Sequence, residues 1–167
     1  LPGIPARAGR ADVLDAGLMG WLKEQGVPFA VQYFCNYRAD GIPPHHAVFV
    51  DKVEATRSVT RRLIDLGHRR IGFLGIVRDI PNDPSIYNYH GFKAAMEWAG
   101  LSVRPAHAVH TEEEGPMGAL DLAAALLRPA DRPTAVVAQT DGLAIAILKA
   151  AADLGVRVPD DLSVIGF

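Results

Sequence analysis

The sequence predicts an α/β protein built on parallel β-sheets, with one subdomain nearly complete and a second one partial. Segments in which apolar residues recur at helical spacing alternate with short apolar runs of strand length. Glycine follows four of the predicted helices, at Gly26, Gly67, Gly100 and Gly155, where a left-handed residue ends a helix at least cost. Helices that alternate with strands connect them through right-handed crossovers, which predicts parallel pairing.

The segment from Val59 to Gly75 shows this pattern most clearly. Val59, Leu63 and Leu66 are spaced i, i+4 and i+7, so they predict one apolar face of a helix that Gly67 ends. Residues 71–74 form a short apolar run, typical of a parallel strand that is covered on both faces. The strand ends on Gly75, which would let a backbone or a ligand approach closely.

The rest of the chain repeats this plan. Before that segment we expect helices over about residues 12–25 and 52–66, and strands over residues 29–33 and 47–50. After it we expect helices that start at Asp83-Pro84, Gly115-Pro116 and Asp141, and strands over residues 106–110, 135–138 and 163–167. Met117 and Leu154 are expected on inward helix faces, and Asp141 is expected to be an N-cap. The turn-rich loop over residues 34–44 separates two helix-strand patterns, so we place a boundary between residues 1–45 and 46–167.

The composition is that of an ordinary globular protein. The 167 residues are enough for a sizeable core, and 49% of them are hydrophobic and 22% charged. No apolar run approaches the roughly 20 residues of a membrane span. The net charge of -2 gives no electrostatic footprint for nucleic acid, so we do not expect this chain to bind DNA by itself. The single cysteine, Cys35, cannot form an internal disulfide, which favours the reducing cytoplasm.

Motifs for catalysis or cofactor binding are absent from the sequence. It contains no phosphate-binding loop, no dinucleotide-binding glycine pattern and no nucleophile elbow, so we expect neither an enzyme nor a cofactor. His107 and His110 lie three residues apart on a predicted strand and point to opposite faces, so no metal site is expected. Residues 112–114 are all glutamate, which indicates either acid-base chemistry or a solvated loop before a helix.

Ligands of open parallel sheets bind outside the carboxyl ends of the strands. These ends are predicted at Tyr33-Phe34, at Gly75-Ile76, and within residues 110–113 and 139–141, so four segments converge on one candidate cleft. Asp141 precedes an apolar helix, where it either only caps the helix or also contacts a ligand. Tyr33, Phe34 and Tyr37 either pack against the protein or offer an aromatic surface to a sugar.

Three runs give the sequence a resemblance to the LacI/GalR family of bacterial transcription regulators. LGHRRIGFLG at 66–75 resembles the helix-to-strand signature of that family. PTAVVAQTDGLA at 133–144 and LGVRVPDDLSVIGF at 154–167 resemble two later runs of the family, and the Gly91-Phe92 pair lies between the first run and these two. The resemblance implies a type I periplasmic-binding-protein-like fold of two similar Rossmann-like halves. Residues 1–45 would be part of the N-terminal subdomain, and residues 46–167 would be the C-terminal subdomain.

The resemblance also implies an effector site, where this sequence departs from the family pattern. The family's effector-contacting arginine corresponds to Asn88, its ring-stacking aromatic to Glu113, and its Asn-Asp pair to Thr140-Asp141. A further aspartate of the family corresponds to Tyr33. The expected ligand-binding residues are Tyr33, Phe34, Asn88, Glu113, Thr140 and Asp141.

These departures change the expected ligand. Without the arginine and the aromatic ring, and with a carboxylate in their place, the site favours a ligand whose donor or positive charge faces Glu113. In the alternative, Glu113 points to solvent, and Tyr33, Phe34 or Tyr37 stacks on a neutral sugar.

The function implied by the resemblance is that of the effector-sensing and dimerisation region of a LacI-type regulator. It would be a cytoplasmic homodimer without membrane contact, and its effector would be a sugar or a sugar-like molecule. Operator DNA would bind only through a helix-turn-helix domain preceding Leu1, so we interpret the chain as an internal fragment. The alternatives are an exported solute-binding protein of a sugar transporter with the same fold, and a Rossmann-like enzyme, which the missing phosphate-binding glycines argue against.

Overall fold

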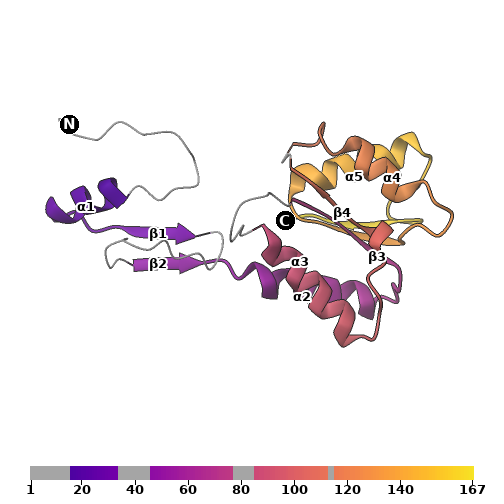
Figure 1. Ribbon diagram of the computed structural model, residues 1–167, viewed down its shortest axis with the longest axis horizontal. Helices are drawn as coiled ribbons and strands as arrows, with labels where there is room; N and C mark the ends of the chain where they lie inside the picture. The colour runs from indigo at the N-terminus through magenta and orange to yellow at the C-terminus, as the bar shows by residue number, and fades with distance from the viewer. Residues whose placement is uncertain (1–15, 34–45, 77–84, 113–114) are drawn as a thin grey trace. The chain divides into compact units, whose positions relative to one another are not determined.

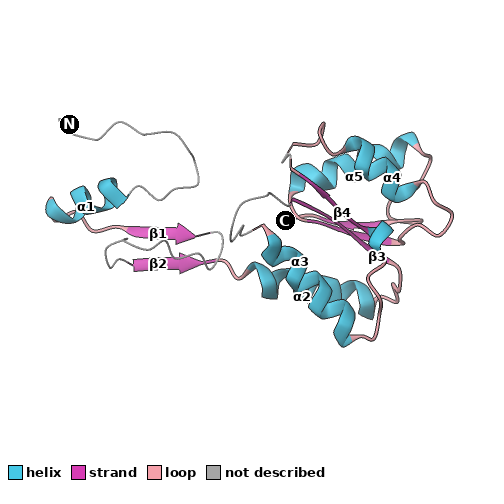
Figure 2. Cartoon of the chain, in the orientation of Figure 1, coloured by secondary structure: helices cyan, strands magenta, loops and turns pink. Residues whose placement is uncertain are grey.

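The computed structural model describes residues 16–33, 46–76, 85–112 and 115–167 of the chain. The chain divides into two compact units, Leu1–Asp51 and Lys52–Phe167. Each unit contains its own β-sheet, and every strand pair in both sheets is parallel (Figures 1 and 2). The predicted α/β architecture is therefore confirmed for the described residues.

The described part of the first unit consists of α1 (Ala16–Glu24), β1 (Ala30–Tyr33) and β2 (His46–Phe49). The two strands pair with Ala30 opposite His46. Because β2 pairs with β1, it belongs to the first unit, which ends at Asp51 and not at the expected boundary after residue 45. The turn-rich loop that suggested this boundary connects two strands of one sheet.

The second unit has a four-stranded sheet between two helical layers. In chain order its elements are α2 (Lys52–Asp65), β3 (Ile71–Ile76), α3 (Ile86–Trp98), the short 3₁₀-helix η1 (Pro105–His107), β4 (Ala108–Thr111), α4 (Leu120–Leu127), β5 (Ala135–Ala138), α5 (Asp141–Asp153) and β6 (Ser163–Ile165). The strand order is β4-β3-β5-β6. Helices α2 and α3 cover one face of the sheet, and α4 and α5 cover the other (Figure 1).

The central strand β3 supplies both hydrophobic cores of this unit. All six of its residues are buried. Because alternate side chains of a strand point to opposite faces, Phe73 packs with Phe92 and Met96 of α3, and Leu74 packs in the core that α4 and α5 cover. The expected strand over residues 71–74, covered on both faces, is confirmed.

Helix ends follow the expectations better than helix faces do. Gly26, Gly67, Gly100 and Gly155 all have positive φ values, between 66° and 96°, as expected of residues that end helices. Leu66 is 58% exposed and Met117 is 78% exposed, so both predicted inward positions are wrong. Both residues lie outside the helices: α2 ends at Asp65, and α4 begins only at Leu120.

Two further boundaries differ from those expected. The chain first forms η1 before β4, so this strand covers Ala108–Thr111 and not residues 106–110. The described part of α3 begins at Ile86 with Ser85 as its N-cap, and the predicted cap Asp83 lies outside the described residues. Leu154 follows α5 and is 37% exposed, so its predicted inward position is also wrong.

Gly91 sets the distance between α2 and α3. A Cβ atom at this position would overlap the carbonyl oxygen of Val53 and would lie 3.1 Å from the backbone nitrogen of Arg57. The two helices therefore approach closely only because residue 91 has no side chain. The Gly91-Phe92 pair thus serves packing on both sides: the glycine faces α2, and Phe92 is fully buried against β3.

The variant Gly91→Ala should lower the free energy of unfolding by about 1–3 kcal/mol, because the added methyl group must push α2 and α3 apart. Urea denaturation followed by circular dichroism measures this change. Gly20→Ala in α1 is the control, since nothing lies within 4 Å of its added Cβ and alanine favours the helix. Equal stability of the two variants would contradict the close helix contact.

Candidate functional site

The four parallel strands of the second unit end at the same edge of the sheet, here called the carboxyl edge: Ile76, Thr111, Ala138 and Ile165 are their last residues. Three of the four predicted segments therefore lie side by side, in the order β4, β3 and β5. The fourth predicted segment begins at Tyr33, the last residue of β1, which belongs to the first unit. The carboxyl edge is the candidate site in the second unit.

Gln139 fastens the ends of β3 and β5 together. Its side-chain Oε1 accepts a hydrogen bond of 2.8 Å from the backbone N–H of Ile76, and its own N–H donates to the carbonyl of Leu74 at 2.9 Å. A Cβ atom on Gly75 would lie 2.8 Å from Oε1 of Gln139 and would overlap the ring of Phe73. β3 continues to Ile76, so the expectation that it ends on Gly75 is wrong, and this glycine makes room for the protein's own side chains.

His110 lies beside Gly75 in the sheet, near the end of β4. Its ring meets Tyr89 of α3 edge-on at 5.2 Å between centroids and lies 6.0 Å from the ring of Phe73. Desolvation by burial lowers the pKa of His110 below its usual value, so the imidazole is neutral at pH 7. Its Nδ1 atom is buried, and no described residue pairs with it.

Asn88, the neighbour of Tyr89, is 2% exposed. Its Nδ2 donates a 3.0 Å hydrogen bond to Oγ1 of Thr56, which ties α3 to α2. Its Oδ1 is buried and has no hydrogen-bond partner among the described residues. A buried acceptor without a partner costs about 1–3 kcal/mol, which a ligand donor would recover.

The expected N-cap role of Asp141 is wrong, because Thr140 caps α5. Thr140 has extended backbone angles, φ -138° and ψ 160°, and its hydroxyl accepts a hydrogen bond from the N–H of Leu143. Asp141 is the first residue of the helix, is exposed, and donates its N–H to the carbonyl of Phe167 at 2.8 Å. Its carboxylate stands over Gly166, where a Cβ atom would lie 2.8 Å from Oδ1.

The described part of the structure does not place the remaining expected site residues at this edge. Phe34, Tyr37 and Glu113 lie outside the described residues, and of Tyr33 only the backbone position at the end of β1 is described. The choice between a ligand that faces Glu113 and a sugar that stacks on an aromatic ring therefore stays a prediction. No group of three or more metal-ligating side chains occurs within the described ranges.

Three residues that shape the carboxyl edge were not among the expected ligand-binding residues: Tyr89, His110 and Gln139. His110 and Gln139 lie within strand-end segments that the sequence does indicate. Tyr89 had a weaker signal, since it is adjacent to Asn88 on a predicted helix. Only the packing of α3 on β4 shows that Tyr89 and His110 are in contact.

A profile described as "Periplasmic binding protein-like domain" matches residues 60–167. The chain belongs to this family. The match covers α2 from Thr60 onward and the whole four-stranded sheet, and thus the strands that form the carboxyl edge.

Individual relatives of this periplasmic-binding-protein-like chain are transcription regulators. It is 31% identical over 121 residues to the catabolite control protein A of Priestia megaterium, a match that covers 72% of this chain and 36% of that protein. Its fold resembles the crystal structure of a LacI-family regulatory protein from Chloroflexus aggregans, with a TM-score of 0.72, 28% identity, and coverage of 90% of this chain and 52% of that one.

A second solved structure is that of a sugar-binding LacI-family transcriptional regulator from Escherichia coli, complexed with phosphate. Its TM-score is 0.69 at 28% identity, and the match covers 92% of this chain and 53% of that one. The resemblance to LacI-type regulators is confirmed, and these relatives are not enzymes. The chain spans about a third of the length of the curated relatives that it matches and about half of the solved chains.

Among the described helices, none combines the length and the apolar character that crossing a membrane requires.

Replacing the cap residue tests the assignment of Thr140. Thr140→Ala should lower the free energy of unfolding by about 1 kcal/mol, because the N–H of Leu143 loses its acceptor, whereas Thr140→Ser keeps the hydroxyl and most of the stability. Asp141→Ala should lower the free energy of unfolding by less, since the Asp141 carboxylate stabilises α5 only through its interaction with the helix dipole. Chemical denaturation of the three variants measures the order, and a larger loss for Asp141→Ala than for Thr140→Ala would restore the aspartate as the cap.

Proposed function

We propose that this chain is the effector-binding part of a LacI-type transcription regulator and that its effector is a sugar or a sugar-like molecule. The observation that carries the proposal is the pair of unpaired buried polar atoms at the carboxyl edge, Oδ1 of Asn88 and Nδ1 of His110. Both belong to elements that meet there, because Tyr89 beside Asn88 packs on His110. In this proposal a ligand supplies the missing hydrogen-bond partners of these two atoms.

The chemistry of these atoms fits a hydroxyl-bearing ligand. Oδ1 of Asn88 accepts a hydrogen bond, and the neutral ring of His110 offers a nitrogen that donates or accepts, depending on its tautomer. Hydroxyl groups both donate and accept, so a polyhydroxylated molecule satisfies both atoms without bringing a charge into the edge. Tyr89 adds partly exposed aromatic surface next to His110, against which the C–H face of a sugar ring packs well.

The remaining expected residues take part in the same proposal. Thr140 and Asp141 stand at the N-terminus of α5 on this edge, where the Asp141 carboxylate is exposed and open to ligand hydroxyls. We assign Tyr33 and Glu113 to the ligand-facing surface by family resemblance, and Phe34 by its place at a predicted strand end. Binding of an amine-bearing ligand would indicate that Glu113 faces the ligand. Binding of a neutral sugar would indicate that an aromatic ring stacks on it.

The proposed setting follows from the family. The first unit would contribute to the N-terminal half of the effector domain, and the second unit would be the C-terminal half. Operator DNA would be bound by a helix-turn-helix domain outside this chain, in the cytoplasm, and the chain would have no catalytic activity. The regulators among the relatives favour this setting over an exported solute-binding protein.

Calorimetric titration with a panel of neutral pentoses and hexoses, sugar acids and amino sugars tests the site. We expect one class to bind, and His110→Phe to weaken that binding about tenfold, because it removes the ring nitrogens but keeps the contact with Tyr89. Lys93→Ala, on the exposed side of α3, is the control and should bind as the unmodified protein does.

Two results would contradict the proposed site. One is that no member of the panel binds. The other is that a sugar binds to His110→Phe and to Asn88→Leu as tightly as it binds to the unmodified protein. Each of these variants lacks one of the two unpaired atoms. Circular dichroism of each variant separates a lost ligand contact from a lost fold.

We further propose that α5 contributes to a homodimer. Ile145 and Leu148 are 55% and 43% exposed, and their spacing of three places them on one side of the helix. Burying two neighbouring large apolar side chains in an interface removes apolar surface from water. The LacI-type resemblance implies that a second copy of the chain forms this interface.

Ile145→Asp should shift the protein from dimer towards monomer in sedimentation velocity experiments, because it places a charge in an apolar contact. Ser102→Asp, an exposed loop position after α3, adds the same charge elsewhere and should leave the dimer intact. A monomeric unmodified protein at high concentration, or an unchanged dimer in Ile145→Asp, would argue against this use of α5.

A further inference from the structure

Trp98 is a tryptophan that the second unit leaves in water. It is the last residue of α3 and is 68% exposed, although Phe92 and Met96 of the same helix are buried in the core. Trp98 belongs neither to that core nor to the partly buried residues that pack against it. Tryptophan is enriched at protein–protein interfaces, where its ring buries a large apolar area.

Arg61 of α2 lies over the ring of Trp98. Its guanidinium carbon is 4.2 Å from the ring centroid, which is a cation–π contact. Nε of Arg61 is buried, and the side chain makes no hydrogen bond or ion pair with a described residue. The ring therefore holds the guanidinium in place, and the two terminal nitrogens of Arg61 keep their donors for a partner. The contact occupies one face of the Trp98 ring and leaves the other face available.

The charge of Arg61 is not neutralised by the helices around it. Two carboxylates of α2 and α3 are already paired with other cations: Glu54 with Arg57, and Glu97 with Lys93. Asp65, one turn after Arg61 on α2, forms no ion pair with it in the described part of the chain. The pair of Arg61 and Trp98 thus combines an exposed aromatic ring with an uncompensated positive charge.

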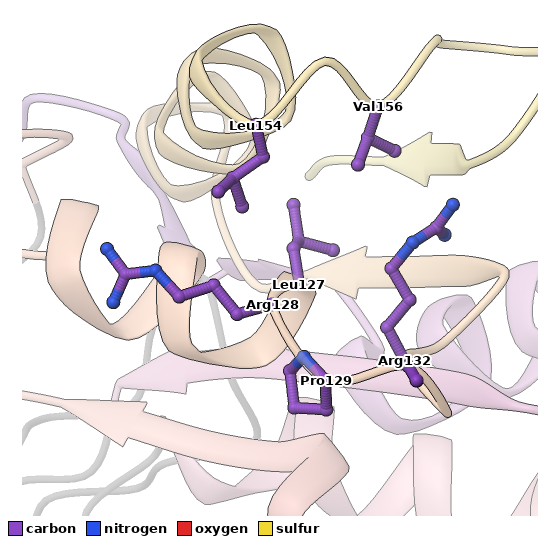
Figure 3. A pocket seen from close by; sticks show the side chains of 7 residues that line it. Leu127, Arg128, Pro129, Arg132, Leu154 and Val156 are labelled. Carbon is purple, nitrogen blue, oxygen red and sulfur yellow. The ribbon is translucent and has the colours of Figure 1, made fainter.

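The arginines on the other side of the sheet are arranged differently. A hollow at the end of α4 is lined by apolar side chains that include Leu127 and Pro129 (Figure 3). Arg128 and Arg132 lie on opposite sides of this hollow, and the Arg128 side chain is directed away from it (Figure 3). Of the arginines in the described ranges, only Arg61 lies over a described aromatic ring. Only there does the structure hold a guanidinium and an exposed apolar surface together.

We propose that Trp98 and Arg61 form a docking surface for another protein, whose contacting segment carries an aspartate or glutamate next to an apolar side chain. The apolar side chain covers the free face of the Trp98 ring, and the carboxylate accepts hydrogen bonds from the terminal N–H groups of Arg61. Tryptophan and arginine are among the residues that most often dominate binding at protein interfaces. Because the ring already holds Arg61, its side chain loses little freedom when the partner binds.

A nucleic acid fits this surface less well than an acidic protein segment does. Glu54, Asp65 and Glu97 are exposed on the same two helices and repel a phosphate backbone, whereas a single carboxylate needs to reach only Arg61. The surface also remains accessible in the homodimer proposed above. That dimer uses α5, which covers the opposite face of the sheet from α2 and α3.

Selection of random peptides displayed on phage tests the proposal, with the whole chain as the immobilised target at physiological salt. We expect the enriched peptides to carry Asp or Glu next to an apolar residue. Synthetic copies of these peptides should bind in solution. The variants Trp98→Ala and Arg61→Gln should each weaken that binding about tenfold, because each removes one half of the docking surface.

Arg128→Gln is the matched control, since Arg128 is also exposed but lies over no described aromatic ring. It should bind the selected peptides as the unmodified protein does. Trp98→Phe keeps an aromatic ring and should bind more tightly than Trp98→Ala. Circular dichroism of each variant separates a lost contact from a lost fold, and Trp98 lies outside the core, so its variants are expected to fold normally.

Several results would each overturn the proposal. One is that no peptide is enriched above a reference protein, and another is that the enriched peptides lack a carboxylate. A third is that Trp98→Ala binds them unchanged. Binding of a single-stranded oligonucleotide that Trp98→Ala abolishes would indicate a nucleic-acid surface instead, and a shift of Trp98→Ala from dimer to monomer would indicate a second copy of the chain. Failure of the sugar titration at the carboxyl edge would not affect this proposal, since the two surfaces share no residue.

Discussion

The burial of β3 between two helical layers is the constraint on which the second unit depends. Each of its six residues is inaccessible to solvent, so its backbone groups must pair with β4 and β5 to avoid the cost of unpaired buried polar groups. Its side chains are divided between the two faces of the sheet and thereby supply two separate cores. The neighbouring strand β5 adds Val136 and Ala138 to one core and Ala135 and Val137 to the other.

The same pairing gathers polar residues at the carboxyl edge. Because all strands run in one direction, the residues that follow them meet on one side, and Gln139 then closes the gap between β5 and β3. The edge is nevertheless incompletely satisfied, since Asn88 and His110 each keep a buried polar atom without a partner among the described residues. Two further buried side-chain atoms without a described partner, Nε of Arg57 and Nε of Arg61, belong to α2.

The two edges of the sheet differ in chemistry for a topological reason. At the carboxyl edge the chain enters helices, and polar and aromatic groups collect there together with the exposed Asp141 carboxylate. At the opposite edge the helices end and their last carbonyls favour cations, as at Arg128, the C-cap of α4.

The sequence by itself determined the elements and their class. Periodic apolar residues, short buried runs and the four helix-ending glycines are local signals, and each is a property of a few adjacent residues. The predicted parallel sheet then indicated the strand ends as the candidate site, and the family resemblance indicated Asn88. Tertiary structure alone decided which groups meet: β2 joins β1 because of hydrogen bonds between strands, and Leu66 and Met117 are exposed because they lie outside α2 and α4. Thr140, and not Asp141, caps α5. The backbone N–H of Asp141 donates to the carbonyl of Phe167, which is distant in sequence. The extended backbone of Thr140 lets its hydroxyl accept a hydrogen bond from the N–H of Leu143. Such contacts depend on the whole sheet being assembled, which no local pattern of residues encodes.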